Sequence, residues 1–327
     1  MSEHRDDRMR RVEETVLGSP PHYTKGEVTE AAGVPIERAE DLWQAMGFAH
    51  VGPDDAVFTE ADIAALRALV SLVSAEVIPT DLESAVARSL AQTMSRLAEW
   101  QTGIFKSLLG DQFSDLEATS EVASAILPVM ERLQNYVWRR HLAATVSREL
   151  DQRDPGDERV QVIGFADLVG YTRLIRDFTE LELARLIDGF ESLAGGVVAQ
   201  NHGRVIKTVG DEVLFATEGA AEAAEIALAL NEEIAKTDLL PPLRIGLAKG
   251  PVLARFGDVY GSTVNIASRL TSVARPASVL VDREVAAALR GDSAFRLISV
   301  GPTKVQSFRG LRAWALRRAG GEQPAQM

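Results

Sequence analysis

The chain contains no cysteine among its 327 residues. Disulfide bonds and cysteine-ligated zinc sites are therefore excluded, and the composition is compatible with a reducing cytoplasm, where we expect the protein to reside. A long apolar run is also lacking. The longest near-apolar stretch, "IAALRALVSLVSAEVI", is interrupted by Arg67 and Glu76, so it is too short and too charged to span a bilayer. The charged N-terminus "MSEHRDDRMRR" does not resemble a signal peptide.

An excess of basic residues is lacking as well, because the formal net charge is −12. Such an acidic surface repels duplex DNA and anionic lipid, so a phosphate-bearing ligand has to be held by a local site. The length predicts about two domains, since single cores rarely grow beyond roughly 250–300 residues.

The pattern of apolar residues changes near the middle of the chain. Residues 1–20 are polar, and we expect them to be mobile. From residue 23 to about 150 apolar residues recur every three or four positions, which is typical of helices. The polar stretch "DQRDPGDE" at 151–158 predicts a linker. Beyond it, strand-like and helical segments alternate, which indicates a sheet covered by helices in residues 159–320.

One acidic residue lies where a strand should end. Asp167 comes late in the apolar run "VIGFADLVGYT", where an unpaired carboxylate would be costly. Gly170, Tyr171 and Thr172 follow and open a helix, whose free N–H groups suit phosphate. The alternative is that Asp167 merely caps that helix.

A second acidic residue lies in a predicted hairpin, "GRVIKTVGDEVLF". Gly210 permits the tight turn, and Asp211 on its own would read as a turn residue. Taken together, Asp167 and Asp211 predict a Mg²⁺ site for a nucleotide, because Mg²⁺ is usually held by one or two carboxylates and substrate phosphates.

A third cluster is "RFGDVYGSTVNIASRL". Asp258 lies in a glycine-flanked loop, and Asn265 and Arg269 are four residues apart on one helix face. Each of these residues alone is weak evidence for a functional site. The order of the three motifs "FADLVGYT", "KTVGDE" and "GDVYGSTVNIASR" along the chain is stronger evidence.

In this order and spacing, residues 158–318 resemble the catalytic domain of class III nucleotidyl cyclases. The resemblance implies an α+β domain with a ferredoxin-like, palm-type βαββαβ sheet. It also implies two Mg²⁺ or Mn²⁺ ions per site and head-to-tail dimers that share their sites. The implied metal ligands are Asp167, Asp211 and the carbonyl of Leu168; the implied purine readers are Lys207 and Asp258; the implied transition-state pair is Asn265 and Arg269.

The pair Lys207 and Asp258 favours ATP as the substrate. An ammonium donates to N1 of adenine and a carboxylate accepts from its amino group, whereas guanine would leave both groups mispaired. Because the chain holds both halves of the implied site, a homodimer could carry two equivalent sites. Glu212 has no implied role, and we expect it to be a structural or solvated neighbour.

The late part of the chain departs from the family pattern. Gln306 stands where a phosphate-binding lysine is common, and Lys304 or Arg309 could replace it. Three alternatives stay open: a guanylate cyclase, a diguanylate cyclase (since "VGDEVLF" is similar to a "GGDEF" hairpin), and a degenerate cyclase-like module for sensing or dimerisation.

Residues 1–150 are predicted to form an all-helical regulatory domain. Its start resembles the helix-turn-helix of MerR-like regulators, with the turn at residues 31–34. DNA binding is disfavoured, because residues 20–70 hold nine acids and three bases. The layout also resembles soluble cyclases tuned by pH or fatty acid, and His141, on the expected coupling helix, would be a regulatory switch.

Overall fold

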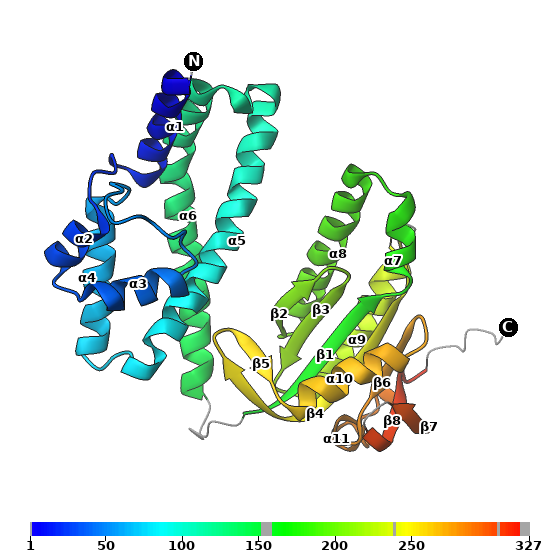
Figure 1. Ribbon diagram of the computed structural model, residues 1–327. Helices are drawn as coiled ribbons and strands as arrows, with labels where there is room; N and C mark the ends of the chain where they lie inside the picture. Colours follow the sequence, from blue (N-terminus) through cyan, green and yellow to red (C-terminus); the bar gives the residue numbers. More distant parts are fainter. Residues whose placement is uncertain (1, 152–158, 238–239, 306–307, 321–327) are drawn as a thin grey trace. The chain divides into compact units, whose positions relative to one another are not determined.

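The structure is a computed structural model that describes residues 2–151, 159–237, 240–305 and 308–320 (Figure 1). The chain divides into two compact units, Met1–Arg153 and Asp154–Met327. No helix in the described ranges is both long enough and apolar enough to cross a bilayer.

The N-terminal unit is helical. Its helices are α1 (Ser2–Leu17), α2 (Lys25–Ala32), α3 (Ile36–Ala45), α4 (Glu60–Ser74), α5 (Glu83–Leu109) and α6 (Leu116–Asp151), with single 3₁₀ turns at Thr80–Leu82 and Gly110–Ser114. Residues 1–20 were expected to be mobile, but most of them form α1, which packs on α6 and bonds it through Thr15 and Ser120 at 2.7 Å. Burial against a neighbour stabilises a helix whose own sequence signal is weak.

The predicted helix-turn-helix is present at α2 and α3. Thr24 and Glu27 form a reciprocal capping box that starts α2. Gly33 ends α2 at φ 70°, a left-handed conformation that glycine adopts without penalty. A small core holds these helices against α4 and α5; it consists of Val28, Val34, Ala39, Leu42, Phe58, Ile63, Leu66 and Ala87.

The C-terminal unit is a mixed sheet with helices on both faces. Its strands are β1 (Arg159–Leu168), β2 (Arg204–Val209), β3 (Glu212–Thr217), β4 (Leu243–Arg255), β5 (Asp258–Tyr260), β6 (Ser278–Val281), β7 (Phe295–Val305) and β8 (Phe308–Arg318). Its helices are α7 (Tyr171–Leu174), α8 (Glu180–Gln200), α9 (Ala220–Ile234), α10 (Ser262–Val273) and α11 (Arg283–Ala288), with a 3₁₀ turn at Ile175–Asp177.

The first part of this unit has the predicted βαββαβ topology. The sheet order is β2-β3-β1-β4-β6-β8-β7, with β5 pairing β4 off this path, so β1 lies between β3 and β4 and is antiparallel to both. Beyond β6, β7 and β8 extend the sheet as an antiparallel pair.

Two cores lie on opposite faces of the sheet. Val162, Ala166 and Leu168 of β1 join the core under α8 and α9. Ile163 and Phe165 join the core under α10. Burial on both faces explains why β1 reads as a near-continuous apolar run.

Candidate active site

The end of β1 brings three carboxylates and one guanidinium together. Asp167 lies opposite Glu212 of β3 and opposite Arg244 of β4. Side chains alternate between sheet faces, so Asp167 shares the α10 face with Ile163 and Phe165. Arg244 donates a short hydrogen bond from Nε to Oδ2 of Asp167. Its Nη1 also reaches the carbonyl of Ser272 in α10, at 3.4 Å.

The β2–β3 turn holds Asp211 beside this strand end. The turn depends on Gly210, whose φ is 62°. The N–H of Leu168 donates to the carbonyl of Asp211 at 3.1 Å, which ties the turn to β1. Burial raises the pKa of Asp211, and the charge of Asp167 raises it further. Asp167 and Asp211 are therefore close enough to repel each other.

Glu212 belongs to the same group. Burial, followed by the charges of Asp167 and Asp211, raises its pKa to about 7, although Arg244 acts in the opposite direction. These carboxylates repel one another when all of them are ionised, so a bound cation stabilises the group. We had expected Glu212 to be a structural or solvated neighbour, and it is a half-buried neighbour of both aspartates.

The oxygen donors fit a divalent ion that is completed by substrate. Two carboxylates and the carbonyl of Leu168 are the hard ligands that Mg²⁺ and Mn²⁺ take. In the described ranges, no three His, Asp or Glu side chains form a ready-made metal cage.

Gly170, Tyr171 and Thr172 lie where β1 passes into α7. Gly170 has φ 79° and turns the chain into this short helix. Burial raises the pKa of Tyr171, and the nearby Asp211 adds to the shift. The turn therefore lies next to the acidic group. The side chain of Thr172 lies outside the described residues.

The two residues expected to read the base are in contact. Lys207 of β2 donates from Nζ to Oδ2 of Asp258 in β5 at 2.5 Å. The other oxygen of Asp258 accepts from the backbone N–H of Val259 at 2.8 Å, which fixes the orientation of the carboxylate. Both side chains stay accessible, with 41% of Lys207 and 27% of Asp258 exposed. An ammonium donor and a carboxylate acceptor are thus presented side by side to a ligand.

Asn265 and Arg269 lie on α10, with Asn265 exposed and Arg269 half-buried. Tight packing sets the position of this helix. A Cβ on Gly246 of β4 would come within 2.4 Å of backbone atoms of α10. The hydroxyl of Thr271 in α10 also donates to the carbonyl of Phe165 in β1, at 3.2 Å. Gly246 and Thr271 therefore hold the helix that carries the expected transition-state pair.

Sequence reasoning missed Arg244, Gly246 and Thr271. Arg244 had a detectable signal, because it is the one charged residue among the alternating apolar residues of "LRIGLA". Gln306 lies outside the described residues, as do the side chains of Lys304 and Arg309, although Lys304 belongs to β7 and Arg309 to β8. His141 is exposed on α6 in the N-terminal unit.

The structure defines a class of fold, an α+β domain with a βαββαβ sheet and an acidic group at the end of β1. Residues 156–318 match the family "Adenylate and Guanylate cyclase catalytic domain". An adenylate cyclase of Streptomyces coelicolor is 45% identical over 83% of this chain and 73% of its own length. An adenylate cyclase of Glutamicibacter nicotianae is 34% identical over 96% of this chain and 83% of its own length. This chain belongs to the adenylate and guanylate cyclase family.

An adenylate/guanylate cyclase/hydrolase from Silicibacter pomeroyi is 25% identical, covers 49% of this chain and 98% of its own, and has a TM-score of 0.44. The family assignment rests on the two sequence relatives and the domain match.

Proposed function

We propose that this enzyme converts ATP to 3′,5′-cyclic AMP and pyrophosphate. The observation that carries the choice of substrate is the contact between Lys207 and Asp258. In that pair, the ammonium donates to N1 of adenine while the carboxylate accepts from the 6-amino group. With GTP, the N1–H donor faces the ammonium donor and the O6 acceptor faces the carboxylate acceptor, so neither hydrogen bond can form. The relatives named adenylate cyclase support the same choice.

The reaction needs the ribose 3′-oxygen to attack the α-phosphorus in line while pyrophosphate leaves. Asp167, Asp211 and the carbonyl of Leu168 would hold two divalent ions, which when bound activate the 3′-hydroxyl and offset charge on the leaving group. The N–H groups of the turn at Gly170 and Tyr171 cradle phosphate oxygens. Asn265 orients the nucleotide, and the planar guanidinium of Arg269 stabilises the charge that spreads over the reacting phosphate.

The site is proposed to be shared by two copies of the chain. One copy supplies Asp167 and Asp211, and the other supplies Lys207, Asp258, Asn265 and Arg269. A head-to-tail homodimer with two-fold symmetry then holds two equivalent sites, and a monomer holds none that is complete. The N-terminal unit is proposed to modulate this assembly in response to protons or a fatty acid, with His141 on α6 as the pH-responsive group.

The experiment that tests the proposed activity is a parallel assay with ATP and GTP on the full chain, in Mg²⁺ and in Mn²⁺. We expect cyclic AMP from ATP and at least about a hundredfold lower kcat/KM for GTP. Lys207→Met should lower kcat/KM for ATP by about a hundredfold and remove most of the preference. Lys236→Met, which removes an exposed surface lysine paired to Glu233, is the matched control and should change neither value. A preference for GTP would refute the proposal.

A further inference from the structure

The strand that carries Lys207 has little support from the rest of the sheet. β2 lies at one end of the strand order, and in the described ranges it pairs only with β3. Val205 lies opposite Phe215 of β3. Lys207, two residues later, lies opposite Leu214, so Ile206 is an extra residue in β2. Such a β-bulge interrupts the ladder and bends the strand, so the backbone just before Lys207 is held less firmly than that of an interior strand.

A hydrogen bond to α8 lies directly after this interruption. Thr208 lies opposite Val213, whose side chain belongs to the core under α8 and α9, so Thr208 faces α8 as well. Its hydroxyl donates to Oε1 of Glu191 in α8 at 2.6 Å. This distance is typical of a hydrogen bond from a hydroxyl to a carboxylate, which is stronger than one between neutral groups. The edge strand is thus joined to a helix at the residue next to Lys207.

The helix that supplies Glu191 is firmly packed. Phe190, the preceding residue, is 1% exposed in the core under α8 and α9, and Ala194 of the same helix is equally buried. Thr208 in turn is branched at Cβ, which leaves its side chain few rotamers. A hydroxyl held by α8 therefore also fixes the backbone of β2 beside Lys207.

The partner of Lys207 is held independently of α8. Asp258 accepts from Nζ of Lys207 through one carboxylate oxygen and from the N–H of Val259 through the other. The side chain of Val259 is 4% exposed in the core under α10. The acceptor of the pair is therefore fixed, while the donor belongs to a bulged strand at the sheet edge. The geometry of the pair depends mainly on what holds Lys207.

We propose that Thr208 and Glu191 are positioning residues that set the selectivity for adenine through Lys207. The role rests on the proposed function, in which the ammonium of Lys207 donates to N1 of adenine. Thr208 faces α8, the side of the sheet opposite to Lys207, so neither positioning residue has to touch the nucleotide. Their hydrogen bond confines the Lys207 backbone to one place, and the ammonium then meets N1 in one geometry. Without it, the ammonium occupies a range of positions, and its mismatch with guanine costs less.

The test is the ratio of kcat/KM for ATP to kcat/KM for GTP, measured on the full chain. Thr208→Val removes the hydroxyl and should lower this ratio about fivefold, mainly through a higher KM for ATP. Thr208→Ser keeps the hydroxyl and should retain most of the ratio. Glu191→Ala removes the acceptor and should match Thr208→Val. An unchanged ratio in both Thr208→Val and Glu191→Ala would overturn the proposal, and so would a loss in Thr208→Ser as large as in Thr208→Val.

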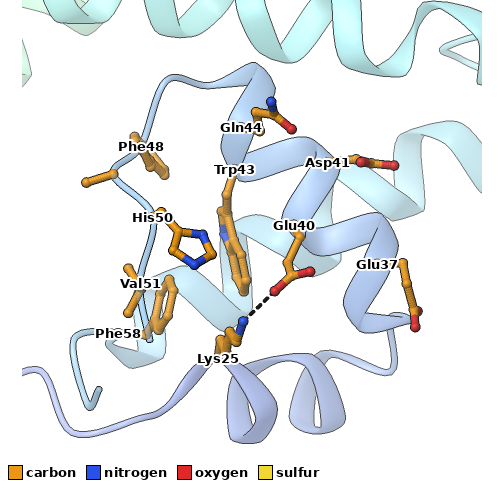
Figure 2. A pocket seen from close by; sticks show the side chains of 11 residues that line it. Lys25, Glu37, Glu40, Asp41, Trp43, Gln44, Phe48, His50, Val51 and Phe58 are labelled. Atoms are coloured by element: carbon orange, nitrogen blue, oxygen red, sulfur yellow. Dashed lines mark hydrogen bonds and ion pairs between the residues drawn. The ribbon is translucent and has the colours of Figure 1, made fainter. Parts of the chain in front are cut away.

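Two controls separate positioning from a general loss of stability. Thr217→Val, at the last residue of β3, removes a hydroxyl that donates to the carbonyl of Gly219 at 2.7 Å. Glu40→Ala, in α3, removes an exposed helical carboxylate that accepts from Lys25 at 2.5 Å, as Figure 2 shows. Both controls should leave the ratio unchanged. A fall in either control as large as in Thr208→Val would mean that selectivity follows stability, which would overturn the proposal.

The metal half of the site gives a second readout. Asp211 lies three residues after Thr208, but its turn is tied to β1 by the hydrogen bond from Leu168. Thr208→Val should therefore leave Mn²⁺ binding without nucleotide unchanged, and kcat for ATP should change less than KM. A loss of Mn²⁺ affinity as large as the loss of selectivity would show that Thr208 holds the whole hairpin, which would overturn a role through Lys207.

Lys207→Met distinguishes a failure of this role from a failure of the proposed function. Lys207→Met should remove most of the preference for ATP, and adding Thr208→Val should lower the ratio no further, because Thr208 acts through Lys207. A wild type without preference for ATP, or a Lys207→Met variant that keeps it, would refute the proposed function and the positioning role together. If Lys207→Met removed the preference and Thr208→Val lowered the ratio further in that background, the positioning role alone would fail.

Discussion

Arg244 donates a hydrogen bond to one carboxylate oxygen of Asp167. The two residues lie 77 positions apart in sequence and directly opposite each other in the β1–β4 pairing. The guanidinium therefore offsets charge in a group that also contains Asp211 and Glu212. The proposed metal ions have to enter a site in which an internal cation is already present.

Removing Arg244 should consequently make the site bind divalent cations more tightly. For Arg244→Met we expect Mn²⁺, measured by electron paramagnetic resonance without nucleotide, to bind about threefold more tightly, because a competing positive charge is gone. Arg275→Met removes an exposed arginine next to α10 and serves as the control. Weaker Mn²⁺ binding in Arg244→Met would show that Arg244 instead organises the aspartates for metal.

Shared sites make a quantitative prediction for mixed subunits. Asp211→Ala breaks the metal half of a site and Arg269→Ala breaks the other half, so each homodimer should lose about a hundredfold or more in kcat. In a random equal mixture, half of the dimers are hybrids with one intact site and one doubly broken site. The mixture should recover about one quarter of the wild-type activity. Recovery no greater than the sum of the separate variants would refute sharing.

The proposed role of His141 predicts a change in the pH response of the full chain. An imidazole changes charge between about pH 5 and pH 8, and His141 is exposed on α6. His141→Ala should flatten the dependence of kcat on pH over this range while leaving the free energy of unfolding nearly unchanged. His202→Asn, at an exposed turn residue of the C-terminal unit whose φ is 59°, is the control, since Asn tolerates that conformation. An unchanged profile in His141→Ala would contradict the role.

The parts of the site that the sequence predicted are those with a local signature. The hairpin around Gly210, the strand that ends near Asp167 and the helix with Asn265 and Arg269 each follow from a short pattern of apolar, glycine and polar residues. The contact of Lys207 with Asp258 was expected only from the family resemblance. No spacing rule brings together two residues 51 positions apart, and the contact depends on how β5 folds back along β4.

The remaining features depend on register and packing. Asp167 meets Arg244 only because β1 and β4 pair in one particular register, and a shift by one residue would turn Arg244 to the other face. α1 has few apolar residues and forms against α6. The sheet extension by β7 and β8 was missed because Gly301 and Pro302 interrupt the strand pattern, and both fall in β7.

The packing of α10 on the sheet can be tested at Gly246. A Cβ there would lie 2.4 Å from the carbonyl oxygen of Ala267 and from the backbone nitrogen of Thr271, so the helix has to move. Gly246→Ala should lower the free energy of unfolding by about 1–3 kcal/mol and reduce kcat by at least about tenfold, since Asn265 and Arg269 shift with the helix. Gly103→Ala, in open space within α5, is the control and should be neutral or slightly stabilising. Full activity in Gly246→Ala would show that α10 is not positioned by this contact.

A buried carboxylate near the other end of the sheet should make stability depend on pH. Asp282 is 5% exposed and begins α11, accepting from the N–H of Val285 at 2.8 Å and of Lys249 at 3.3 Å. Burial outweighs these hydrogen bonds and raises its pKa to about 6 from the ordinary 3.8. The folded protein then binds this proton more tightly than the unfolded chain does. The stabilisation is complete below about pH 4 and is lost as the pH rises through about 6.

Asp282→Asn should remove this dependence, because an amide caps a helix nearly as well as a carboxylate and carries no charge. Relative to the wild type, the variant should gain roughly 1.4 kcal/mol of unfolding free energy between about pH 5 and about pH 8, measured by urea denaturation. Asp292→Asn, in an exposed turn before β7, gives the control for a carboxylate without burial. If the difference between Asp282→Asn and the wild type were the same at both pH values, the Asp282 carboxylate would be ionised throughout, and the two backbone N–H groups would outweigh its burial.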